Sequence, residues 1–104
     1  MTKEQFLQDI QKTYSDGFEL LKRKNADYAS TNDPYQNFRF AEIVGVPIER
    51  AILVRMSDKL ARISNILTKP AEVKDETIED TLLDLINYAA ILKVYICAEN
   101  VTKK

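Results

Sequence analysis

Apolar residues recur at helical spacing in three long segments of the chain. The first segment runs from residue 2 to about 26, the second from Pro47 to about Leu67, and the third from Asp75 or Thr77 to about Glu99. This spacing gathers the apolar side chains on one face, which is typical of amphipathic helices. The apolar positions are Phe6, Ile10, Tyr14, Phe18 and Leu21, then Ile48, Ile52, Met56, Leu60, Ile63 and Leu67, then Ile78, Leu82, Leu85, Ala89, Leu92 and Ile96.

Turn-forming residues separate these helices. Asp33 before Pro34 is typical of an N-cap and a first helical residue, so it predicts a short helix that ends at Gly45. Thr68-Lys69-Pro70 ends the second long helix. No segment alternates apolar and polar residues with a period of two, so we expect no sheet.

Capping residues and one glycine refine the long helices. Thr2 with Gln5, and Thr77 with Asp80, match the capping-box pattern at helix starts. Gly17 stands inside the first helix, where glycine costs about 1 kcal/mol relative to alanine. It indicates either a close approach of another helix or a tolerated weak position.

These elements predict an all-α fold, a small bundle of three long helices and one short one, in a single domain over residues 1–104. A chain this short buries little surface, so we expect a homodimer or a larger assembly that buries a helix face. Leu83, Ile86 and Ile91 lie off the main apolar stripe of the last helix and are the expected contact residues.

The composition limits which catalytic groups and metal ligands the chain can supply. The chain has no histidine and a single cysteine, Cys97, which excludes Ser-His-Asp and Cys-His catalysis and leaves carboxylates, ligands suited to Mg²⁺. The net charge of −1 makes nucleic acid or an anionic membrane an improbable partner. No run approaches about 18 apolar residues and the start does not resemble a signal peptide, so we expect a cytoplasmic protein without a membrane span.

Acidic residues form a strip on the last helix. Glu76, Asp80, Asp84 and Asn87 fall on one side of it. Capping and the helix dipole account for acids in the first turn. They do not account for Asp84, which lies one turn further along between Leu83 and Leu85. The strip is either a solvated face or a cation site.

A basic strip on the second long helix complements it. Arg55, Asp58, Lys59 and Arg62 lie at helical spacing along the edge of the apolar face. They are either solvated side chains with a weak Asp58–Arg62 pair, or a phosphate-binding strip that faces the acids across the bundle.

The segment after the first helix collects groups that stack on bases and read them. Lys24, Asn25, Asp27 and Tyr28 lead into Tyr35, Asn37 and Arg39. Ordinary capping and turn chemistry explains each of them singly, whereas a nucleotide site explains the collection.

Four motifs together resemble a known family. They are Lys24-Asn25-x-Asp27-Tyr28, Asn37-Phe38-Arg39, Arg55-Met56-Ser57-Asp58-Lys59-Leu60-x-Arg62-Ile63, and Asp75-Glu76-x-x-x-Asp80-Thr81-Leu82-Leu83-Asp84-Leu85-x-Asn87-Tyr88-Ala89. They resemble the phage-associated family called nucleotide modification associated domain 1, which is similar to the all-α nucleoside triphosphate pyrophosphatases of the MazG and dUTPase-like superfamily.

The superfamily resemblance implies a helical bundle that is dimeric or larger, Mg²⁺ held by carboxylates of two helices, and hydrolysis between the α- and β-phosphates of a nucleotide. The superfamily pattern is Glu-Glu-x-x-Glu on one helix and Glu-x-x-Asp on another. Here Asp58-Lys59-x-x-Arg62 stands at the first pattern, and Thr81 stands at the first position of the second, leaving Asp84 as its match.

The leading hypothesis is therefore a phage or bacterial nucleotide-handling protein, with Mg²⁺-dependent hydrolysis of a nucleoside triphosphate to monophosphate and pyrophosphate if it is an enzyme. Asp58, Asp80 and Asp84 would be catalytic, and these three with Glu76 would hold Mg²⁺. Lys24, Asn25, Asp27, Tyr28, Arg39, Arg55, Lys59, Arg62 and Asn87 would bind the nucleotide. The alternatives are a non-catalytic nucleotide-binding protein and a helical interaction module.

Overall fold

The computed structural model describes residues 1–27, 32–69 and 77–101, with four helices and no strand in these ranges. The helices are α1 (Lys3–Asp27), α2 (Gln36–Ile43), α3 (Ile48–Thr68) and α4 (Ile78–Glu99). The predicted three long helices and one short one are confirmed. Two predicted site residues, Glu76 and Tyr28, lie outside the described residues, and only the backbone of Asp27 lies within them.

The start of α2 differs from the prediction. Tyr35 occupies the N-cap position, and it makes no side-chain cap. Asp33 instead accepts the backbone N–H of Tyr35 at 3.0 Å and binds the Arg39 guanidinium at 2.6 Å, so it shapes the turn that precedes the helix. The helix ends as predicted, because Gly45 adopts a φ of 83° that lets Val46 N–H bond the Ala41 carbonyl at 2.9 Å.

The caps of the long helices follow the sequence pattern with one exception. Thr77 and Asp80 form both bonds of a capping box at the start of α4. Thr2 accepts the backbone N–H of Gln5 at 3.0 Å, but the Gln5 amide bonds Asp9 instead of returning to Thr2. The start of α1 therefore has half of the predicted box.

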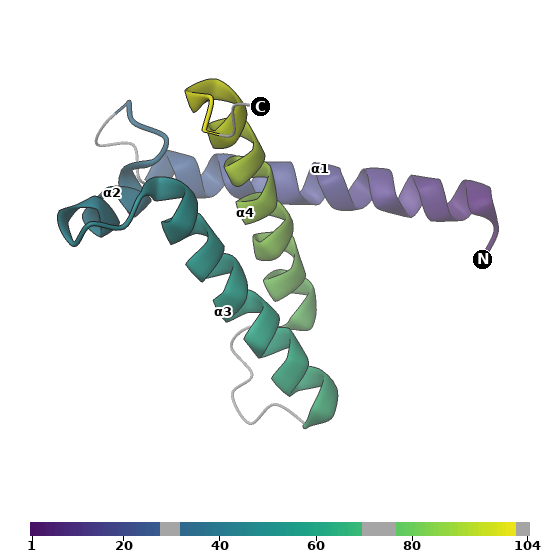
Figure 1. Ribbon diagram of the computed structural model, residues 1–104. Helices are drawn as coiled ribbons and strands as arrows, with labels where there is room; N and C mark the ends of the chain where they lie inside the picture. The colour runs from purple at the N-terminus through teal and green to yellow at the C-terminus, as the bar shows by residue number, and fades with distance from the viewer. Residues whose placement is uncertain (28–31, 70–76, 102–104) are drawn as a thin grey trace.

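The arrangement of the helices is set by α4 (Figure 1). α3 and α4 pack along each other, α2 packs on α3, and α1 crosses α4. Phe38, Ile48 and Ile52 are the buried apolar residues of the described part. The rings of Tyr88 and Tyr95 on α4 lie edge-on against Phe38 and Tyr35, with centroids 6.2 and 5.0 Å apart, and extend this small core.

Gly17 marks a close approach of α1 to α4. A Cβ at this position would lie 3.3 Å from Asn87 Oδ1 and 3.8 Å from Leu83 Cδ2. The Asn87 amide, which is 9% exposed, donates to the Gly17 carbonyl oxygen at 3.0 Å. Of the two interpretations of Gly17, the structure supports the close helix approach.

The apolar character of α4 exceeds the expectation from sequence. Its length and composition are sufficient to cross a membrane, with a mean hydropathy of 1.5 over 18 residues. Length and composition by themselves are weak evidence of a membrane span, and 6% of this window is buried inside one copy. In the second turn of α4, Asp84 is paired with lysines of two other helices, which favours packing within protein.

The α1–α4 contact yields a stability prediction. Gly17→Leu would force the helices apart and leave the buried Asn87 amide without its acceptor. We expect a loss of about 2 kcal/mol in the free energy of unfolding, after the gain in helix propensity is subtracted. Urea unfolding followed by circular dichroism measures it.

The matched control is Ser15→Leu, an exposed position on the same helix, where we expect a change within about 0.5 kcal/mol. Equal unfolding free energies for the two variants would contradict the close approach.

Candidate functional site

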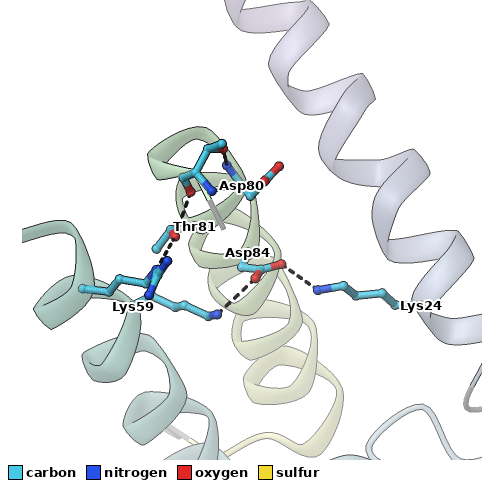
Figure 2. Close-up of polar contacts among 7 residues, drawn as sticks. Lys24, Lys59, Asp80, Thr81 and Asp84 are labelled. Carbon is cyan, nitrogen blue, oxygen red and sulfur yellow. Dashed lines mark hydrogen bonds and ion pairs between the residues drawn. The ribbon is translucent and has the colours of Figure 1, made fainter. Parts of the chain in front are cut away.

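Asp84 is the point where three helices meet through charged side chains. Its Oδ1 lies 2.8 Å from Lys24 Nζ of α1, and its Oδ2 lies 3.1 Å from Lys59 Nζ of α3. The two lysines reach the carboxylate from opposite sides of α4 (Figure 2). We call these three residues the Asp84 cluster. The side chain of Asp84 is 13% exposed, while Lys24 remains 47% exposed.

A second polar contact joins α3 to α4 one turn before Asp84. Thr81 is fully buried, donates its hydroxyl to the Thr77 carbonyl at 3.1 Å and accepts from Arg62 Nε at 3.3 Å. Asp80 points to the helix start, where it completes the capping box (Figure 2). Arg62 is thus positioned by the hydroxyl of Thr81.

The electrostatics of the cluster keep Asp84 ionised. Burial raises the pKa of a carboxyl group, but the hydrogen bonds and charges of Lys24 and Lys59 outweigh it, so the pKa of Asp84 is lowered below its ordinary value. A part-buried carboxylate with cations on both oxygens needs no proton at neutral pH. It also holds together two ammonium groups that repel each other.

Part of this arrangement was expected from the sequence. The acidic strip was predicted to be a solvated face or a cation site, and the basic strip of residues 55–62 to face it; Lys59 of the basic strip is one of the partners of Asp84. Lys24 was predicted to bind the nucleotide, and it is the other partner. Lys24 and Asp84 are 60 positions apart, so no local signal indicates the pair, although both stand in motifs of the resemblance.

Other predicted site residues lie elsewhere. Asp58 is exposed on α3, and Arg55 lines a depression of about 280 Å³ between α2 and α3. Asn25 borders a separate groove between α1 and α4. Arg39 is engaged by Asp33 and Glu42, which raise the pKa of its guanidinium. Asn87 is engaged by the Gly17 carbonyl, so its amide joins helices.

Thr81 is the buried polar residue that sequence reasoning did not place in the site. Its bond to the Thr77 carbonyl could have been predicted from the sequence, since a threonine inside a helix readily bonds the carbonyl four residues earlier. Its contact with Arg62 depends on the packing of α3 against α4 and has no signature in local sequence.

The acids of the described residues do not fit a resident magnesium ion. No group of three acidic, histidine or cysteine side chains comes together in these parts of the chain. Both oxygens of Asp84 face lysines, and Asp80 serves the helix start. Mg²⁺ prefers several oxygen ligands in octahedral geometry, which these residues do not supply among themselves.

Fold and site define an all-α protein whose helices meet at a lysine–aspartate–lysine cluster. The model of the family described as nucleotide modification associated domain 1 matches residues 24–95, and the chain belongs to this family. The matched range begins at Lys24 and includes the whole Asp84 cluster. Neither the curated proteins nor the solved structures gave a match, so the similarity to the pyrophosphatase superfamily stays a prediction.

The lowered pKa of Asp84 predicts a pH-dependent contribution to stability. The folded protein holds this proton less tightly than the unfolded chain does. Its contribution is therefore present above the unfolded pKa of about 3.9 and lost as the pH falls through the folded value. We expect Asp84→Asn to lower the free energy of unfolding by about 1–2 kcal/mol at neutral pH. The difference should vanish well below pH 4.

Denaturant unfolding of both proteins across this pH range measures the difference. Asp16→Asn is the control, because Asp16 forms an exposed ion pair with Lys12 within α1 and should change stability by less than about 0.5 kcal/mol. A difference for Asp84→Asn that persists unchanged in acid would contradict the ion-pair role.

Proposed function

We propose that this protein binds a nucleotide through its phosphate groups at the Asp84 cluster, without a resident metal ion. The observation that carries the proposal is the convergence of Lys24 and Lys59 on one part-buried carboxylate. Membership of a family named for its association with nucleotide modification supports it.

The chemistry of the cluster suits a phosphate. An ammonium group has three N–H donors, so a lysine bonded to Asp84 can still donate to a phosphate oxygen. Lys24 is half exposed, which leaves its ammonium group within reach of a ligand from solvent. Asp84 is then a positioning residue, because it holds the two cations in place before the ligand arrives.

This proposal corresponds to the non-catalytic hypothesis from the sequence. It is favoured over metal-dependent hydrolysis because both carboxylate oxygens of Asp84 are bonded to lysines and Asp80 caps its own helix. Hydrolysis, the Mg²⁺ cofactor and the phage or bacterial cytoplasm stay predictions. The helical interaction module also stays a prediction, and it differs by requiring no nucleotide affinity.

Calorimetry with an equimolar mixture of the four deoxynucleoside triphosphates tests the proposal. We expect binding that weakens with rising salt, because phosphate recognition is electrostatic, and no binding of the corresponding nucleosides. Lys24→Ala should weaken binding by about tenfold or more, since a charge-assisted hydrogen bond is lost.

Lys12→Ala is the control, because it removes a more exposed lysine of the same helix that is also paired with an aspartate. Its affinity should equal that of the wild type. Equal binding by wild type and Lys24→Ala would remove the cluster from the site, and no binding at all would favour the interaction module. Release of pyrophosphate that depends on added Mg²⁺ would overturn the non-catalytic proposal in favour of hydrolysis.

A further inference from the structure

One copy of this chain exposes more surface than a self-sufficient domain of its size. Its accessible area is 8208 Å², whereas a compact monomer of 12.0 kDa exposes about 6,000 Å². Its radius of gyration is 15.8 Å, compared with about 13 Å for a compact chain of this length. The excess area is large compared with the roughly 800 Å² that each partner buries in a standard interface.

One part of this exposed surface lies on α1. The N-terminal half of this helix extends beyond α4 with no other described helix alongside it (Figure 1). Phe6, Ile10 and Tyr14 on this half are 53%, 36% and 64% exposed. Their helical spacing continues to Gly17, the residue at the α1–α4 contact, so the apolar stripe meets α4 at one end and extends beyond it at the other.

On the C-terminal side of Gly17, the apolar stripe of α1 borders an open apolar groove. Phe18 and Leu21 of α1 line it together with Ala90, Ile91 and Val94 of α4, and its volume is about 320 Å³. Phe18 is 58% exposed and Val94 is 57% exposed, so the groove lacks a cover in the single copy.

We propose that a second copy of the chain covers both surfaces, through antiparallel pairing of α1 with α1 of its partner. A two-fold axis close to the middle of α1 places the Phe6–Tyr14 half of each helix over the Phe18–Asn25 half of the other. The bare stripe of one copy then fills the groove of its partner, and the reverse contact is identical. Such a closed, self-complementary interface is the commonest form of protein assembly.

This interface differs from the contact expected from the sequence. Leu83, Ile86 and Ile91 of α4 were the expected assembly residues, but they are already half-buried within one copy. Leu83 lies at the Gly17 contact and Ile91 packs on the core. The bare apolar surface of α1 is available instead. The inference does not rest on the proposed nucleotide binding, although Lys24 lies within the half of α1 that the partner would cover.

Sedimentation equilibrium at micromolar concentration tests the pairing. We expect twice the 12.0 kDa monomer mass for the wild type. Ile10→Glu should raise the dissociation constant about a hundredfold or more, because each copy would bury a charge in place of an isoleucine. Leu67→Glu is the control at an exposed apolar position near the end of α3, and it should remain dimeric.

Cysteine cross-linking keeps the test decisive if the Ile10→Glu chain does not fold alone. In a Cys97→Ser background, which removes the exposed native thiol, a short bis-maleimide should link Tyr14→Cys chains into dimers. It should not link Lys12→Cys chains, because Lys12 lies on the opposite side of α1. A 12.0 kDa wild type, an assembly larger than two copies, or equal cross-linking of both variants would overturn the proposal.

Discussion

A single part-buried carboxylate is the point at which the three long helices meet. Asp84 lies on the most apolar helix of the described chain, and its charge is tolerable there because Lys24 and Lys59 neutralise it from two sides. Removing either lysine would leave a part-buried charge with one partner fewer, so the position of Asp84 constrains how α1 and α3 lie against α4.

The same residue links the fold to the proposed function. In the proposed function, Asp84 holds two ammonium groups in place before a phosphate arrives. The neighbouring contacts, Thr81 with Arg62 and Asn87 with Gly17, fix the helices on either side of Asp84. Residues that sequence spacing grouped with the nucleotide thus divide into two kinds, with Lys24 and Lys59 bonded to Asp84 and Asn87 joining α4 to α1.

Because the core of one copy is small, association with a second copy would add stability. Three apolar residues are buried among the described ones, and much of the apolar stripe of α1 is bare. Burial of apolar area is the dominant favourable term in folding, so a chain that leaves this much exposed gains stability by association. In the proposed assembly the partner helix passes beside Lys24, the α1 member of the Asp84 cluster, whereas Lys59 approaches Asp84 from α3.

The sequence by itself determined the helices and their ends. Apolar periodicity located the three long helices, and turn residues located the short one. Thr77 with Asp80 capped α4 and Gly45 ended α2, because these signals act over a few residues. It also indicated that Asp84 needs a partner. Only the tertiary structure decided which one, since Lys24 is distant in the chain and the identity of its partner depends on how α1 crosses α4. For the same reason Asp33 serves a turn instead of a cap: its bond with Arg39 arises from the fold of the loop and has no periodicity to reveal it.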